Sequence, residues 1–177
     1  MVTTPEAGQG ATVFIGLGAN LGDARATLRA ALAELQALAD PGSFAASSLY
    51  ASAPVDSSGP DYVNAVARLR TGLAPHALLD ALQAIERRFG RERPYHNAPR
   101  TLDLDVLLFD AQDEDGGIVV ADARLTIPHP RAARRGFVLE PLAELWPAGE
   151  IPGAGRVQAL LASVRRDPSQ RLHRLDA

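Results

Sequence analysis

The sequence contains no cysteine and no lysine, and each absence excludes a class of chemistry. Without cysteine there is no disulfide, thiolate nucleophile or cysteine-based zinc site. Without lysine there is neither a Schiff base nor a Walker-type phosphate loop, which needs its lysine. No apolar run is long enough to span a bilayer, and residues 1–10 lack the basic and apolar regions of a secretory signal. We therefore expect a cytoplasmic protein that does not bind membranes.

The composition favours an anionic small-molecule substrate over a nucleic acid. The length of 177 residues and the hydrophobic content of 46% predict one domain with a real core. The formal net charge of −3 argues against a general nucleic-acid binder. All 18 basic residues are arginines, and nine of them lie between residues 87 and 135. Because a guanidinium group can bind phosphate through two hydrogen bonds, this cluster favours a phosphate ligand.

The hydrophobic pattern predicts elements in the order β-α-β-β-α-β. Strands are expected over 11–17, 44–52, 62–69 and the segment with Asp103 and Asp105, and helices over 24–39 (capped by Asp23) and 75–89. This is the ferredoxin-like arrangement, an α+β fold with a four-stranded antiparallel sheet and both helices on one face. A C-terminal hairpin and helix extension should follow, with an acidic turn over 110–117, short helices after Pro130 and Pro141, and a helix over 156–164.

The domain is expected to span residues 11–164. Residues 1–10 are predicted to be a disordered N-terminal tail, and residues 165–177 a C-terminal tail. Loops over 53–60 and 91–99 have the proline and glycine content of lids that close over a site. We expect a monomer.

Asp103 and Asp105 stand two residues apart in a run that otherwise predicts a buried strand. Since strand side chains alternate, both carboxylates should point to one face, roughly 7 Å apart. Adjacent like charges on a sheet are unfavourable without a positive charge near them, which a divalent metal, an arginine or both could supply. Oxygen ligands favour magnesium, and Arg100 favours a phosphate. The opposite face should carry Leu102, Leu104, Val106 and Leu108.

Three other segments offer binding groups. Tyr62 and Asn64 share one strand face, where they provide a stacking surface and an amide. His129 lies between two prolines beside Arg131, Arg134 and Arg135, which is consistent with a phosphate contact. Phe137, considered alone, would be a core residue.

The segment His96–Leu107 resembles the signature of the 6-hydroxymethyl-7,8-dihydropterin pyrophosphokinase family of folate biosynthesis. The resemblance covers residues 12–164. Where many relatives have Arg-Trp-Gly-Pro-Arg before the two aspartates, this chain has Asn97 in place of the tryptophan, and Tyr95 is a candidate to replace the indole. Further matches occur in order at Gly16–Gly22, Pro60–Ala65, Ile85–Glu86, Gly90–Arg93, Leu125–Pro130 and Arg135–Leu139.

The resemblance implies that the β,γ-diphosphate of ATP moves to the hydroxymethyl oxygen of the pterin, with release of AMP. It implies two Mg²⁺ ions held by Asp103 and Asp105, with Arg91 and Arg100 as phosphate clamps. These four residues are the implied catalytic set. The implied pterin-binding residues are Ser52, Val55, Tyr62, Asn64 and Phe137, with Tyr62 and Phe137 on either side of the ring. The implied ATP-binding residues are Gln83, Glu86, Arg91, Arg93, His96, Arg100, Arg124, Thr126, His129 and Arg135.

Two alternatives stay open beside the pyrophosphokinase. One is a different magnesium-dependent nucleotidyl- or phosphotransferase on the same sheet. The other is a ferredoxin-like ligand-sensing module without catalytic activity, because the fold alone does not determine function. A sensor would have little use for the pair of aspartates, and ADP in place of AMP as product would indicate an ordinary kinase.

Overall fold

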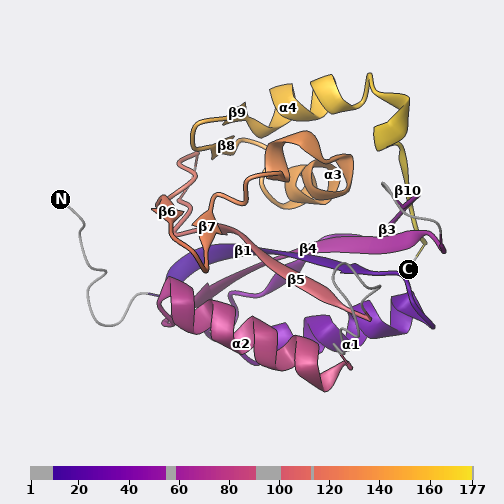
Figure 1. Ribbon diagram of the computed structural model, residues 1–177. Coiled ribbons are helices and arrows are strands. Elements are labelled where there is room, and N and C mark those ends of the chain that lie inside the picture. Colours follow the sequence, from indigo (N-terminus) through magenta and orange to yellow (C-terminus); the bar gives the residue numbers. More distant parts are fainter. Residues whose placement is uncertain (1–9, 55–58, 91–100, 113, 177) are drawn as a thin grey trace.

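The computed structural model describes residues 10–54, 59–90, 101–112 and 114–176. In these residues the main sheet has six strands in the order β10-β3-β4-β1-β5, with β2 also paired to β4. Helices α1 and α2 cover one face of this sheet, and α3 (Gly136–Leu145) and α4 (Val157–Val164) lie over the other (Figure 1). The predicted ferredoxin-like α+β fold is confirmed. The elements of the sheet and its first two helices are β1 (Ala11–Ala19), α1 (Ala24–Gln36), β2 (Ala45–Ala46), β3 (Tyr50–Ser52), β4 (Tyr62–Thr71), α2 (Pro75–Arg88) and β5 (Asp103–Phe109).

The two helices on the first face begin as the sequence predicts. The Asp23 carboxylate accepts a hydrogen bond from the N–H of Ala26 and caps α1, while Pro75 occupies the first position of α2. Both helices pack on the side chains of β4 and β5 that alternate toward them. This core contains Leu28, Leu35, Val63, Ala65, Ala67, Leu69, Leu78, Leu82, Leu102, Leu104 and Val106.

The predicted strand over 44–52 is interrupted at Ser47. The Ser47 hydroxyl accepts a hydrogen bond from the N–H of Val66 at 2.9 Å, in the place of a backbone carbonyl. It also donates to the carbonyl of Ser48. Because the Ser47 hydroxyl replaces a backbone carbonyl in one hydrogen bond to β4, the segment divides into two strands, β2 and β3.

A bulge in β5 moves Leu108 to the face opposite the predicted one. Phe14 pairs with Leu108 and Ile15 pairs with Val106, so that Leu107 is the extra residue. Leu107 and Leu108 therefore both join the second core with Phe14, on the side of Asp103 and Asp105. The prediction that Leu108 shares a face with Leu102 and Val106 was wrong because the bulge breaks the alternation.

The second face is covered by the predicted extension. Helix α3 begins at Gly136 and contains Pro141, instead of starting after that proline. The ring of Trp146, directly after α3, lies 5.2 Å from the ring of Phe14 on β1. The elements of this layer are β6 (Val120–Ala121), β7 (Thr126–Ile127), η1 (Ala132–Arg134), α3 (Gly136–Leu145), β8 (Glu150–Ile151), β9 (Gly155–Arg156), α4 (Val157–Val164), η2 (Pro168–Gln170) and β10 (Leu172–Arg174).

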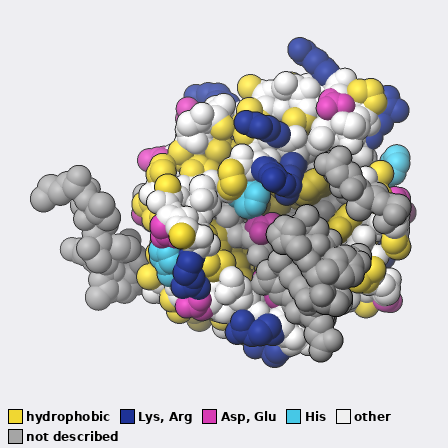
Figure 2. Space-filling model, viewed as in Figure 1, with side chains coloured by type: hydrophobic (Ala, Val, Ile, Leu, Met, Phe, Trp, Pro, Cys, Tyr) yellow, Lys and Arg dark blue, Asp and Glu magenta, His cyan; other side chains and the backbone are white. Residues whose placement is uncertain are grey.

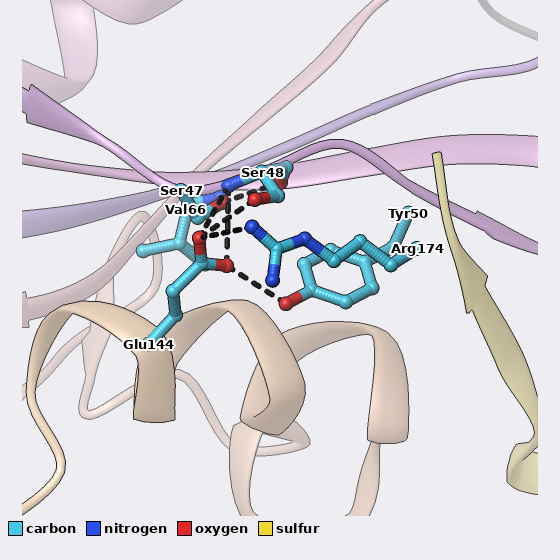
Figure 3. A network of polar contacts seen from close by, with 6 residues as sticks. All are labelled: Ser47, Ser48, Tyr50, Val66, Glu144 and Arg174. Carbon is cyan, nitrogen blue, oxygen red and sulfur yellow. Dashed lines mark hydrogen bonds and ion pairs between the residues drawn. The ribbon is translucent and has the colours of Figure 1, made fainter. Parts of the chain in front are cut away.

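Glu144 connects the C-terminal end of α3 to the sheet (Figure 3). Its carboxylate accepts hydrogen bonds from the N–H and hydroxyl of Ser48 and from the hydroxyl of Tyr50 on β3. A guanidinium nitrogen of Arg174 on β10 lies 3.9 Å away. Burial alone would raise the pKa of Glu144, but the hydrogen bonds from Ser48 and Tyr50 outweigh it and lower the pKa below its ordinary value of 4.5.

We expect Glu144→Gln to lower the free energy of unfolding at pH 7 by about 1–3 kcal/mol, because charged hydrogen bonds from three donors are weakened. A carboxylate whose folded-state pKa is lowered contributes stability above its ordinary pKa of 4.5 and loses it as the pH falls through the lowered value. The difference between wild type and variant should therefore shrink below pH 4.5, as measured by urea unfolding.

Glu150→Gln is the matched control, since Glu150 is exposed and its carboxylate makes no hydrogen bond or ion pair within the described chain. Glu150→Gln should change neither the free energy of unfolding at pH 7 nor its dependence on pH. A stability difference for Glu144→Gln that is constant between pH 3 and pH 7 would contradict the role given to its carboxylate.

Candidate functional site

A cavity of about 500 Å³ opens between the sheet and the α3 layer. Arginine, histidine and acidic side chains meet on this face of the molecule (Figure 2). Its walls come from the end of β3, the C-terminal half of β1, the N-terminal parts of β4 and β5, residues 129–138, and η2. The lining residues are Gly16, Leu17, Gly18, Ser52, Ala53, Tyr62, Asn64, Ala65, Val66, Asp103, Asp105, Leu107, His129, Arg131, Arg134, Arg135, Phe137, Val138 and Gln170.

Two glycines of β1, which lies between β4 and β5, form the floor of the cavity. Gly18 lies between Asn64 on β4 and Asp103 on β5, and Gly16 is paired with Asp105. A Cβ atom on Gly18 would lie 3.4 Å from the Asn64 side-chain oxygen, and one on Gly16 would lie 3.2 Å from Leu107. The absence of side chains at Gly16 and Gly18 thus leaves the space between the amide and the carboxylates open.

Asp103 and Asp105 lie on the cavity face of β5, as their spacing predicts. The residues between and around them, Leu102, Leu104 and Val106, are buried under α1 and α2. The side chain of Asp105 is half exposed. The strand therefore presents two carboxylates to the cavity at positions that solvent can reach.

His129 is held beside Asp105 by the bulge in β5. Its backbone N–H donates to the carbonyl of the bulged Leu107 at 3.0 Å, and its Nε2 lies 4.0 Å from Asp105 Oδ2. Its Nδ1 accepts from the N–H of Arg131, so that Nε2 carries the hydrogen in the neutral ring. Burial and the charges of Arg135 and Arg131 lower the pKa of His129 below 6.5, against the opposing effect of Asp105.

Arg135 faces the two aspartates from the other wall. Its guanidinium carbon lies 5.2 Å from the centre of the Phe137 ring, in a cation–π arrangement. Burial and the charge of Arg131 lower the pKa of Arg135 below its ordinary value, while Asp105 and Asp103 act in the opposite direction. An arginine stays charged at neutral pH under such a shift. The cavity therefore sets a cation against two carboxylates, with space between them.

The other end of the cavity is neutral and partly aromatic. Asn64 and Ser52 are buried, and the Asn64 amide nitrogen donates to the Ser52 hydroxyl at 2.8 Å. Tyr62, two residues before Asn64 on β4, is paired with Ser52 across the sheet. With Phe137 on the opposite wall, this end can accept a flat polar ring.

The structure brings together eight of the residues that the sequence singled out: Ser52, Tyr62, Asn64, Asp103, Asp105, His129, Arg135 and Phe137. Four others do not line this cavity. Gln83 and the buried Glu86 are on α2, Thr126 is exposed on β7, and Arg124 binds Asp80 at 2.6 Å. Val55, Arg91, Arg93, His96 and Arg100 lie outside the described residues, as do Tyr95 and Asn97.

The lining residues that were not among the predicted site residues number eleven: Gly16, Leu17, Gly18, Ala53, Ala65, Val66, Leu107, Arg131, Arg134, Val138 and Gln170. Gly16 and Gly18 could be placed there only with the pairing register of β1. Arg131 and Arg134 belong to the arginine cluster seen in the sequence, but neither was assigned a role. Gln170 lies in the segment predicted as a C-terminal tail, where no pattern indicates a site.

In the part of the chain that the structure describes, no helix is long and apolar enough to cross a membrane. That part also holds no cluster of three or more His, Asp or Glu side chains suited to a metal ion. A metal bound at Asp103 and Asp105 would therefore have no third His, Asp or Glu ligand within the described part of the chain.

Comparisons with known proteins show the family of this chain. The family model of 7,8-dihydro-6-hydroxymethylpterin-pyrophosphokinase (HPPK) matches residues 14–147. The 2-amino-4-hydroxy-6-hydroxymethyldihydropteridine pyrophosphokinase of Pseudomonas aeruginosa is 42% identical over 161 residues, which cover 90% of this chain and 96% of the relative. The protein of the same name from Bacillus subtilis is 38% identical over 133 residues, covering 75% of this chain and 76% of the relative.

Solved structures support the fold. The HPPK-DHPS of Plasmodium falciparum, crystallised with STZ-DHP, superposes with a TM-score of 0.71 at 13% identity over 98% of this chain. This chain spans about half of that protein, 48% of its length. Together, the family match and the two bacterial relatives show that this chain belongs to the 7,8-dihydro-6-hydroxymethylpterin-pyrophosphokinase family.

Proposed function

We propose that this chain transfers the diphosphate of ATP to the hydroxymethyl group of 6-hydroxymethyl-7,8-dihydropterin, giving the pterin diphosphate and AMP in folate biosynthesis. Family membership supports the reaction. The structural observation that supports the reaction is that two carboxylates and an arginine line the same cavity as a neutral, partly aromatic end. A cytoplasmic location and a monomeric state stay predictions of the sequence.

Asp103 and Asp105 would hold two Mg²⁺ ions together with the triphosphate. A site with two carboxylates and no third His, Asp or Glu among the described residues fits magnesium, which keeps water and takes phosphate oxygens as further ligands. The bound metal would neutralise charge on the triphosphate. The glycine floor beside the carboxylates leaves room for those phosphates.

The cationic wall would position the phosphate groups. Diphosphate transfer depends on alignment and charge stabilisation more than on a strong base. Arg135 lies across from the aspartates, and Arg131 and Arg134 line the same cavity. The hydrogen on Nε2 of His129 can be donated to a phosphate oxygen. Arg91 and Arg100 remain part of the proposal as phosphate clamps, on the resemblance alone.

The neutral end would bind the pterin. The Asn64 amide nitrogen is engaged by Ser52, which leaves the Asn64 oxygen, above Gly18, to accept hydrogen bonds from a ligand. A pterin has the N–H groups to donate them, and Tyr62 and Phe137 offer ring surfaces for stacking. Val55 completes the proposed set. The further ATP contacts proposed from the resemblance are Gln83, Glu86, Arg93, His96, Arg124 and Thr126.

The reaction is tested by incubating the protein with ATP, magnesium and 6-hydroxymethyl-7,8-dihydropterin. AMP should form only when the pterin is present, in equal amount to the pterin diphosphate, as followed by chromatography. ADP as the product would point to another phosphotransferase. Binding of the pterin without turnover of ATP would support the sensing module instead.

Asp105→Asn should lower kcat by a factor of about 100 or more, because removal of one carboxylate weakens metal binding where transition-state charge is stabilised. Asp115→Asn makes the same chemical change in the exposed acidic turn and should leave kcat unchanged. Circular dichroism should show both variants folded. Near-normal turnover of Asp105→Asn would refute the metal assignment.

A further inference from the structure

The chain after α4 returns to the edge of the sheet and reaches the cavity. Asp167 caps the short η2 turn, and β10 then pairs antiparallel with β3, with Leu172 opposite Ser52. The N–H of Leu175 continues this pairing by donating to the carbonyl of Leu49 at 2.8 Å. Strand β3, which carries Ser52 into the cavity, is therefore covered on its outer side by the C-terminal segment.

The same segment contacts the first residue of α3. The N–H of Gly136 donates to the side-chain oxygen of Gln170 at 2.9 Å. A Cβ atom on Gly136 would lie 2.6 Å from the carbonyl oxygen of Gln170 and 3.2 Å from Leu172. Since a separation of 2.6 Å from a backbone atom cannot be accommodated without movement, this close approach requires glycine at position 136.

Gln170 does for α3 what an N-cap side chain normally does. The first N–H groups of a helix have no partner within the helix and are usually satisfied by the residue that precedes it. That residue is Arg135, which has no acceptor in its side chain and makes no capping hydrogen bond. The acceptor instead comes from Gln170, 34 residues further along the chain.

The capped residue lies between two residues of the cavity wall. Arg135 and Phe137 flank Gly136, and both line the cavity together with Gln170. Their guanidinium and ring are in contact with each other. Any rotation of the first turn of α3 would move both side chains, while the far end of the helix stays attached through Glu144.

We propose that Gln170 is a positioning residue for the pterin end of the cavity: by capping α3 from the C-terminal segment, it fixes Phe137 and Arg135 against Ser52 and Tyr62. This inference rests on the proposed function for the identity of the ligand. It assigns a role in substrate binding to a segment beyond residue 147, where the match to the family model ends.

Three variants test the proposal. Gln170→Met keeps the length of the side chain and removes the acceptor, whereas Gln170→Glu keeps an acceptor for the N–H of Gly136. His173→Ala is the control on the same segment, because His173 is exposed on β10 and does not line the cavity. The measurements are KM for the pterin and for ATP, kcat, and hydrogen exchange of the Gly136 amide by NMR.

Gln170→Met should raise KM for the pterin about two- to tenfold, the effect of one lost hydrogen bond. KM for ATP should rise less, because Arg131 and Arg134 line the phosphate wall beside Arg135, and kcat should stay nearly unchanged. Its Gly136 amide should exchange faster by a similar factor. Gln170→Glu should restore slow exchange, and His173→Ala should resemble the wild type.

The proposal would be overturned if Gln170→Met had the same KM for the pterin and the same exchange rate of the Gly136 amide as the wild type. It would also be overturned if KM for the pterin and KM for ATP rose by the same factor. A wild-type protein that forms no AMP would refute the proposed function. In that case the hydrogen exchange of the Gly136 amide would still decide whether Gln170 holds the start of α3. Gly136→Ala, which forces Gln170 away, should reproduce the effect of Gln170→Met if the proposal holds.

Discussion

The register of β1 between β4 and β5 is the constraint on which the site depends. It sets Gly18 beside both Asn64 and Asp103, so that the amide and the carboxylate face each other across a residue without a side chain. A slip of one residue in the pairing of β1 with β5 would turn the aspartates into the core under α1 and α2 and bring leucines to the cavity. Burying an unpaired carboxylate is costly, so the hydrophobic core and the chemistry of the site select the same register.

The bulge at Leu107 connects this register to the cationic wall. Because Leu107 is the extra residue of β5, its carbonyl is available to the N–H of His129, and the segment from His129 to Arg135 begins at that point. Two carboxylates on one strand face repel each other, and this segment brings the arginines that offset the repulsion. The bulge at Leu107 thereby places the arginines near Asp103 and Asp105, whose negative charges they offset.

Local patterns in the sequence were sufficient for the framework and for the face of the sheet on which Tyr62, Asn64, Asp103 and Asp105 lie. The alternation around Asp103 and Asn64, the cap at Asp23 and the proline at the start of α2 are properties of neighbouring residues, and the structure has them as predicted. Three features could not be read in this way. The face of Leu108 depends on a bulge, the break at Ser47 depends on Val66 of another strand, and the place of Gln170 depends on Gly136. Each is decided by a partner that is distant in the chain.

The wall formed by α3 shows why such distant polar contacts matter to binding. Its apolar side, continued by Trp146, packs on Phe14, and hydrophobic burial of this kind is strong but has little directional preference. Hydrogen bonds are directional, so the contacts of Gln170 at one end and Glu144 at the other fix the rotation of the helix. Both contacts reach the β3–β10 edge, which also carries Ser52. The helix wall and the strand wall of the pterin end are thus both held at one edge of the sheet. The distance between the two walls is therefore fixed for a ring that binds between them.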